Sequence, residues 1–274
     1  MRLDVQVLNN GRPLPGLTAP DFTVRDEGVL QSLLDFGRER TPLRLLIVLD
    51  VSGSMRRIVA EMASTAERAI AKLGPEDEVA VLAFSRGSRL LHEFTRDDSL
   101  PVRTLRRAFE EEGLGSGSDI NAALIEAARI LAGGASPAAR RAALILTDNG
   151  GLSYQLPNEK VVDALNSASA VLNAIVPPFA RSPAPSQNQD FTPHDVFLLA
   201  RETGGEVLRA DRAAERFLEM IERIAARYAL SYKAPESAPG ARRRVEVALS
   251  PEARRRYPKA EIRSRTSYTA AALR

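Results

Sequence analysis

The feature that most limits the fold of this chain is an uninterrupted apolar run over residues 45–49, followed at once by Asp50. A strand that is apolar at every position is buried on both faces, which is typical of parallel sheets covered by helices. Ser52 and Ser54 follow at alternate positions before a helical pattern begins. Open α/β sheets bind their ligands at the carboxyl ends of the strands, so these three side chains are candidate binding residues.

The chemistry of these three side chains suits a hard metal ion. A carboxylate and two hydroxyls close together in the sequence offer the oxygen ligands that Mg²⁺ prefers, along with some retained water. A structural interpretation is also open at this point. Ser52 or Ser54 can cap the following helix, and Asp50 can occupy a turn.

Two further segments carry the same kind of polar group. A glycine-rich loop contains Ser118 and leads into a predicted helix over residues 121–132. A second apolar run, 142–146, is soon followed by Asp148 and a flexible turn. We therefore expect three separate loops to bring their oxygens together at one rim of the sheet.

These loops resemble the metal-ion-dependent adhesion site of von Willebrand factor type A domains. Five positions are filled in the order of that motif: Asp50, Ser52, Ser54, Ser118 and Asp148. The one departure is Ser118, where the family more often has Thr; the donor oxygen is retained and a methyl group is lost. The resemblance implies Mg²⁺ as the bound ion, with Mn²⁺ or Ca²⁺ as substitutes. It implies the three serines as direct ligands and the two aspartates as direct or water-mediated ones.

The same resemblance implies a function without catalysis. An Asp or Glu side chain of a protein partner would complete the coordination of the metal, as in cell adhesion. The segment around Gly11, Gly16 and Asp21 resembles the N-terminal extension of a bacterial subfamily, the von Willebrand factor A-related proteins of Acidobacteria. The tyrosine pattern of the tail resembles the same subfamily. Asp119, beside Ser118, is a weaker ligand candidate and is typical of the start of a helix.

The pattern of elements predicts an α/β fold with β-rich ends. Strands and helices alternate between residues 43 and 227, which favours a doubly wound, mostly parallel, Rossmann-like sheet with an antiparallel hairpin strand near 89–94. We expect a β-rich N-terminal extension over 1–40, the type A domain over 41–227 and a β-rich C-terminal extension over 228–274. The two ends could pair into one accessory β-structure.

Two local predictions concern the helices. The apolar positions from Ile58 to Leu73 follow a helical stripe, which predicts one helix ended by the glycine and proline that follow. Thr192 and Pro193 form a typical helix start, with the threonine as cap. The preceding residues 181–189, rich in Pro, Ser and Gln, predict a surface loop.

Composition excludes several classes of function. Without cysteine, the chain has no disulfide, thiolate metal site or cysteine nucleophile. The net charge is only +3, but residues 241–265 carry nine Lys and Arg against three acids. No aromatic-rich RNA-binding signature accompanies them, so we interpret them as a solvated face and expect no nucleic-acid partner.

No apolar run approaches the roughly 20 residues of a membrane span. The chain opens within a strand pattern, so an export signal, if the protein is secreted or periplasmic, is expected upstream.

Two other functions compete with adhesion. One is a metal-dependent phosphotransferase or hydrolase; a phosphotransferase of the haloacid dehalogenase type would need a second Asp two residues after Asp50, where Ser52 stands. A serine nucleophile would need a neighbouring base, and the two histidines, His92 and His194, have no motif partner and are expected to be structural or exposed. The third possibility is a structural α/β module whose metal site is unused.

Overall fold

A computed structural model describes residues 1–37, 41–110, 113–134, 139–184 and 186–270. Its larger part is built around a six-stranded sheet with parallel neighbours, except for the antiparallel edge strand β8. In spatial order the strands are β13 (Val207–Arg209), β11 (Ala170–Val176), β9 (Arg140–Leu146), β6 (Leu43–Asp50), β7 (Glu78–Phe84) and β8 (Ser88–Thr95). The predicted doubly wound α/β fold and its antiparallel hairpin strand are confirmed.

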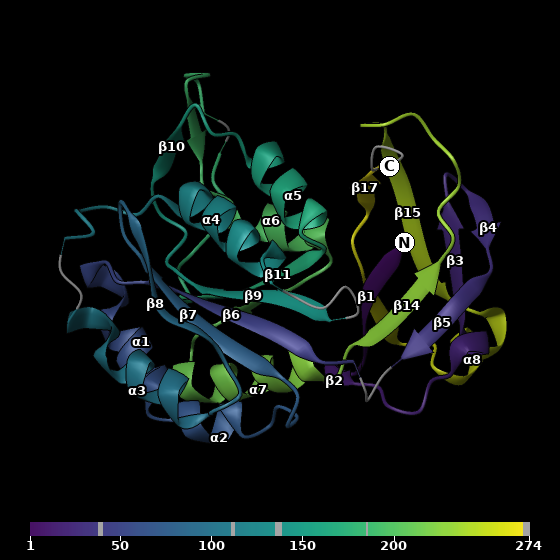
Figure 1. Ribbon diagram of the computed structural model, residues 1–274, viewed down its shortest axis with the longest axis horizontal. Helices are drawn as coiled ribbons and strands as arrows, with labels where there is room; N and C mark the ends of the chain where they lie inside the picture. Colours follow the sequence, from purple (N-terminus) through teal and green to yellow (C-terminus); the bar gives the residue numbers. More distant parts are fainter. Residues whose placement is uncertain (38–40, 111–112, 135–138, 185, 271–274) are drawn as a thin grey trace.

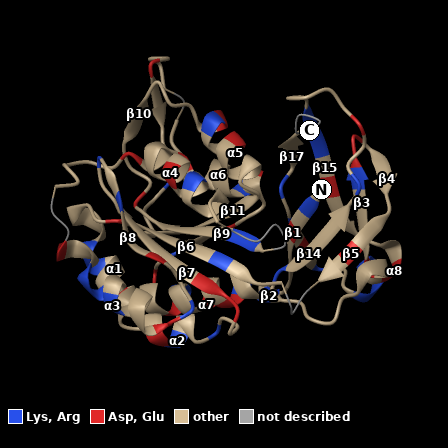
Figure 2. Ribbon diagram, viewed as in Figure 1, with Lys and Arg blue, Asp and Glu red and all other residues tan. Residues whose placement is uncertain are grey.

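The apolar run of β6 explains its central position. Leu45, Ile47 and Leu49 point into one apolar core, whereas Leu46 and Val48 point into a second core on the other face of the sheet. Successive side chains of a strand alternate between its faces, so only a strand with two covered faces can be apolar throughout. Figure 2 shows the charged residues of β6 and β9 toward the strand ends and tan ribbon between them.

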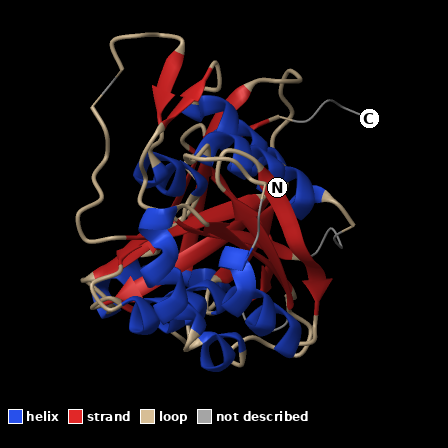
Figure 3. Cartoon of the chain, turned by 90° about the vertical axis from the view of Figure 1, so that its left-hand side faces the viewer, coloured by secondary structure: helices blue, strands red, loops and turns tan. Residues whose placement is uncertain are grey.

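Helices cover both faces of this sheet (Figures 1 and 3). One face carries α1 (Arg56–Ala63), α2 (Ala66–Ile70), α3 (Ser99–Arg107) and α7 (Ala213–Ala225). The other carries α4 (Ile120–Ala132), α5 (Asn158–Ser167) and α6 (Val196–Thr203). Short 3₁₀ turns lie at Ala19–Asp21 (η1), Gly53–Met55 (η2) and Ala108–Glu110 (η3). In the part of the chain that the structure describes, no helix is both long and apolar enough to cross a membrane.

The predicted single helix between Ile58 and Leu73 is wrong, because the structure divides it into α1 and α2. The hydroxyl of Ser64 donates to the carbonyl of Glu61 at 2.6 Å, and that of Thr65 to the carbonyl of Met62 at 3.1 Å. Such local side-chain bonds compete with the regular hydrogen bonds of a helix. The apolar stripe continues across the break, which is why periodicity alone did not reveal it.

The two ends of the chain form a β-sandwich beside the α/β part (Figure 1). One sheet has the order β16 (Ala260–Arg263), β1 (Arg2–Asn9), β14 (Tyr228–Tyr232), β5 (Leu33–Gly37), with β2 (Arg12–Pro13) beside β1. The other has the order β17 (Ser267–Thr269), β15 (Arg242–Leu249), β3 (Phe22–Asp26), β4 (Val29–Gln31), and α8 (Pro251–Arg256) follows β15. Residues 38–40 and 271–274 of the two predicted extensions lie outside the described residues.

Strand pairing joins the two ends directly, as hypothesised from the sequence. β1 lies between β14 and β16, and β3 pairs with β15 along five residues. Apolar side chains from both ends fill the space between the two sheets, with Leu3 and Val24 packed in one cluster with Tyr228. The α/β part is thus inserted between β5 and β14 of the sandwich.

The predicted helix start at Thr192 and Pro193 is also wrong. These residues belong to β12 (Phe191–Pro193), which pairs with β10 (Leu152–Tyr154) in a two-stranded ribbon above the sheet (Figures 1 and 3). Helix α6 begins after Asp195, whose carboxylate accepts hydrogen bonds from two backbone amides of the first turn. A three-residue strand has too few positions for its alternation to be recognised in a sequence.

Candidate metal centre

The five predicted site residues lie together at the carboxyl rim of the central sheet. Asp50 is the last residue of β6, and Ser52 and Ser54 follow it in the turn that leads through η2 into α1. Asp148 follows the neighbouring strand β9, and Ser118 precedes α4. Because β6 and β9 are hydrogen-bonded parallel neighbours, their carboxyl ends meet at the same rim.

Hydrogen bonds connect the three loops into one network. Asp50 Oδ1 accepts from the Ser52 amide at 3.0 Å and from the Ser118 hydroxyl at 3.1 Å. The Ser54 hydroxyl donates to Asp148 Oδ2 at 2.7 Å, and the hydroxyl oxygens of Ser52 and Ser54 are 3.1 Å apart. Side chains from three segments that are far apart in the sequence are therefore neighbours in space.

Sequence reasoning did not single out Thr147, which orients this network. Its buried hydroxyl donates to Asp50 Oδ2 at 2.8 Å, so both oxygens of that carboxylate are held. The same hydroxyl accepts from the Asn149 amide at 3.2 Å. Its position directly before Asp148 was the available signal, because a hydroxyl at the end of an apolar strand needs a partner when buried.

The carboxylate of Asp50 is buried without a cationic partner. The residue has no exposed surface, while Ser54 at the mouth of the site is exposed. Burial raises the pKa of Asp50, the hydrogen bonds from Ser52 and Thr147 oppose the rise, and the neighbouring Asp148 adds to it. Within the described residues, no Lys, Arg or His forms an ion pair with Asp50 or Asp148.

The donor set fits a hard cation. It consists of two carboxylates and three hydroxyls, all oxygen ligands of the kind that Mg²⁺ and Ca²⁺ take. A cluster of three or more His, Cys, Asp or Glu that could hold a metal is not found among the described residues. That finding agrees with the composition of this site, where serine hydroxyls replace further carboxylates.

Asp119 has a different place from the five residues. Its carboxylate accepts from the Ala122 amide at 3.1 Å and caps α4, as expected for a helix-start residue. It also accepts from the hydroxyl of Ser153 in the ribbon. Burial opposes ionisation of Asp119, but hydrogen bonds from His194, Ser153 and Ala122 together lower its pKa.

His194 is structural rather than exposed. It has no accessible surface, its Nε2 lies 2.9 Å from the Ser153 hydroxyl, and its Nδ1 lies 2.9 Å from the carbonyl oxygen of Gly150. The imidazole thus connects the turn after Asp148 to the ribbon. Ser153 is fully buried as well, so this serine and histidine lack the access to substrate that a nucleophile and base need.

The ribbon that follows the Asp148 loop presents exposed apolar side chains. Leu152 and Tyr154 are 53% and 61% exposed, and Phe191 is 38% exposed. The rings of Tyr154 and Phe191 are tilted against one another with centroids 5.5 Å apart. Contiguous exposed apolar groups often mark an interaction surface.

Comparison with known proteins finds one family model that matches a segment of the α/β part. Residues 45–151 match the model of the von Willebrand factor type A domain, and this range contains all five predicted site residues. None of the curated proteins compared with the chain matches it.

Solved structures are similar to this chain at low sequence identity. Proximal thread matrix protein 1 from the mussel byssus is 13% identical with a TM-score of 0.50, over 70% of this chain and 50% of that one. A von Willebrand factor type A protein from Catenulispora acidiphila is 14% identical with a TM-score of 0.49, over 98% and 74% of the two chains. The pilus adhesin SpaC from Lactobacillus rhamnosus GG is 11% identical with a TM-score of 0.48, over 80% and 35%. The matched segment and the α/β fold around it are thus similar to the von Willebrand factor type A domain.

Proposed function

We propose that this protein is a metal-dependent protein-binding module. The observation that carries the proposal is the joining of Asp50, Ser52, Ser54, Ser118 and Asp148 in one hydrogen-bonded network at the sheet rim. The three serines would hold Mg²⁺ directly, and the two aspartates directly or through water. When bound, the ion supplies a positive charge that a carboxylate can coordinate.

The residues of the chain prepare this site in two ways. The hydrogen bonds from Thr147 and the Ser52 amide fix the orientation of the Asp50 carboxylate before any ion arrives. Burial of that carboxylate without a cation leaves its charge poorly compensated, so a cation from solution is favoured. The exposed Ser54 faces the side from which a ligand can approach.

The partner in this proposal is a protein that offers an Asp or Glu side chain. Leu152 and Tyr154 are exposed on the strand that follows the Asp148 loop, Phe191 is paired with Tyr154, and these apolar side chains would contact the surface around that acid. A role without catalysis and a location outside the cytoplasm belong to the same proposal. The finer resemblance to the Acidobacterial subfamily stays a prediction.

Calorimetric titration of chelator-treated protein with MgCl₂ and with MnCl₂ tests the metal site. We expect saturable binding by the wild type and at least 100-fold weaker binding by Asp50→Ala. This variant loses a direct or water-mediated metal ligand together with the hydrogen bonds that its carboxylate accepts. Asp163→Ala, at an exposed position of α5, is the matched control and should bind like the wild type. Absence of binding, or equal binding by Asp50→Ala, would overturn the proposal.

Partner capture tests the second half of the proposal. The wild-type protein serves as bait for envelope extract of the native organism, in Mg²⁺ and in chelator, beside an Asp50→Ala bait. A partner retained only by the wild type in Mg²⁺ supports the adhesion role. A metal site without any Mg²⁺-dependent partner favours the structural module, and turnover of an aryl phosphate favours the enzyme.

A further inference from the structure

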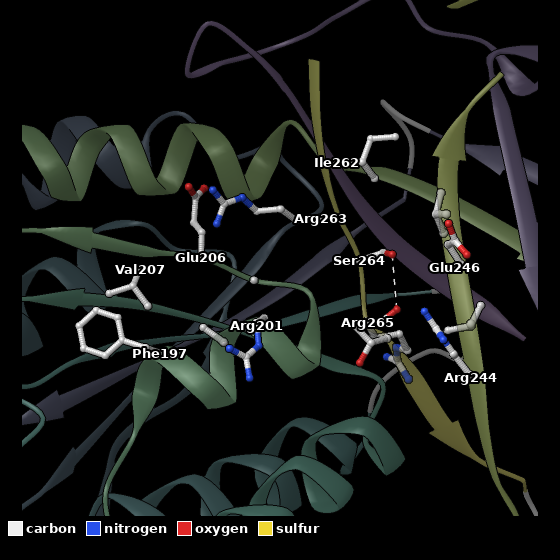
Figure 4. A pocket seen from close by; sticks show the side chains of 15 residues that line it. Phe197, Arg201, Glu206, Val207, Arg244, Glu246, Ile262, Arg263, Ser264 and Arg265 are labelled. Atoms are coloured by element: carbon white, nitrogen blue, oxygen red, sulfur yellow. Dashed lines mark hydrogen bonds between the residues drawn. The ribbon is translucent and has the colours of Figure 1, made fainter. Parts of the chain in front are cut away.

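A cleft lies between the α/β part and the β-sandwich, away from the metal centre. Its volume is about 550 Å³, and side chains from α6, β13, β15, β16 and the segment after β16 line it (Figure 4). The cleft borders the amino-terminal end of β13, whereas the metal residues lie at the carboxyl rim of β6 and β9. None of the five candidate metal residues lines the cleft, and β11 lies between β13 and β9 in the sheet, so the two sites are separate.

One wall of the cleft is charged because of strand alternation. Val245 and Val247 of β15 point into the core of the sandwich. Arg244 and Glu246 therefore point to the opposite face of the strand, toward the cleft. Arg244 is exposed, and its guanidinium takes part in no ion pair or hydrogen bond found among the described residues. The facing side contributes apolar groups, with Phe197 of α6 and Val207 of β13.

Arg265, at the base of the cleft, is a buried cation without an acidic partner in the described part of the chain. It is only 3% exposed, and its Nη1 donates to the carbonyl oxygen of Asn166 at 3.1 Å. Burial lowers the pKa of Arg265 to about 10, with weaker opposing attraction from Asp4. The interpretation of residues 241–265 as one solvated face is therefore wrong for Arg265. Burying a cation without a counter-charge costs free energy, which a bound anion would offset.

The acidic groups near the cleft do not remove this excess of positive charge. Glu206 is buried and already paired with Arg223. Arg201 pairs with Glu202 at 3.2 Å at the outer edge. Glu246 remains as an exposed acid on the same face of β15 as Arg244 and would repel an anion.

The backbone is closely packed at the base of the cleft. Gly204 has φ +83°, and a side-chain carbon there would lie 2.2 Å from the backbone of Ser264. Only glycine therefore permits the end of α6 to contact the segment that carries Arg265. The close contact at Gly204 thus fixes the shape of the cleft between the two parts.

We propose that this cleft binds a small organic acid, with the carboxylate at Arg244 and Arg265 and an apolar body against Phe197 and Val207. A cavity of this size, lined by apolar side chains with a few charged groups, is typical of small-molecule sites. The site is independent of the metal centre and of the function proposed there.

Calorimetry with 4-phenylbutyrate tests the site, and chelator is present throughout so that no metal ion can take the carboxylate. The neutral 4-phenylbutan-1-ol and inorganic phosphate are the comparison ligands. We expect phenylbutyrate to bind at least tenfold more tightly than either one. No binding of phenylbutyrate, or equal affinity for the alcohol or for phosphate, would overturn the proposal.

Variants locate the binding. Arg244→Gln removes an exposed guanidinium and should weaken phenylbutyrate binding at least fivefold with the fold intact, while Glu246→Gln should strengthen it about twofold. Arg255→Gln makes the same charge change on the exposed side of α8 and should leave the affinity unchanged. Unchanged binding by Arg244→Gln, or an equal loss in Arg255→Gln, would place the ligand elsewhere and overturn the assignment.

Discussion

Two aspartates without exposed surface, Asp50 and Asp26, show opposite solutions to the burial of a carboxylate. Asp26, in the sandwich, accepts from the hydroxyls of Tyr232 at 2.8 Å and Tyr268 at 2.7 Å and forms an ion pair with Arg243 at 2.7 Å. Burial would raise the pKa of Asp26, but these partners together lower it. Asp50 has only hydroxyl and amide donors, and burial raises its pKa.

The difference separates a structural carboxylate, Asp26, from Asp50, the carboxylate proposed to bind a metal ion. The sandwich supplies the cation for Asp26 from its own chain, so that carboxylate is complete and joins β3 to β14, β15 and β17. The sheet rim supplies hydrogen-bond donors for Asp50 but no cation. Two equally buried carboxylates thus differ: Asp26 is paired with a cation of its own chain, whereas Asp50 has hydrogen-bond donors without a cationic partner among the described residues.

The largest expected effect is on the sandwich. Asp26→Asn should lower the free energy of unfolding at pH 7 by about 3 kcal/mol, because it leaves Arg243 without its buried partner. A lowered pKa means that this stabilisation is present above the unfolded value of 3.8 and is lost as the pH falls through the folded pKa. Urea unfolding at several pH values measures it, with Asp163→Asn as control. A difference that persists at the lowest pH would contradict the comparison.

The next effect concerns the proposed metal site. Thr147→Val keeps the shape of the side chain but removes the donor to Asp50 Oδ2, and residues that orient metal ligands typically contribute tenfold or more to affinity. We expect Mg²⁺ or Mn²⁺ to bind about tenfold more weakly in calorimetry. Thr104→Val removes a comparable hydroxyl in α3 and serves as control. Unchanged affinity in Thr147→Val would show that Asp50 needs no such support.

Asp50→Asn should act in the opposite direction to Asp26→Asn. In chelator at pH 7 we expect the free energy of unfolding of the variant to be about 1 kcal/mol higher than that of the wild type. This is the order of the cost of one poorly compensated buried polar group. A raised folded pKa means that the ionised carboxylate costs stability above that pKa, and the difference closes as the pH falls through it toward 3.8. Added Mg²⁺ should stabilise only the wild type. A variant that is less stable at pH 7 in chelator would contradict this sign.

The smallest effect is expected at Ser118. Ser118→Thr restores the residue that the family more often has and keeps the hydroxyl that donates to Asp50. The side chain is half-buried, so the added methyl should change metal affinity by at most about twofold. Ser118→Ala, which removes the oxygen, should weaken binding far more in the same titration. Similar losses in both variants would point to crowding rather than to ligation.

The α/β sheet and the proximity of the five site residues could be predicted from the sequence, because both follow from long apolar runs and from short motifs at their ends. Three features escaped it for physical reasons. The break at Ser64 and Thr65 leaves the apolar stripe intact, and the β10–β12 ribbon is too short for its period to show. The contact of Asp26 with Tyr232 and Arg243 joins residues more than 200 positions apart, which no local pattern encodes.

The position of β1 between β14 and β16 has a consequence for synthesis of the chain. Before residue 228 emerges from the ribosome, β1 can pair only with the two-residue strand β2. At roughly 5–20 residues per second, this wait lasts on the order of 10–40 s. The α/β part can fold during that interval, while most of both edges of the first strand stay unpaired and accessible to a chaperone or to an aggregating neighbour.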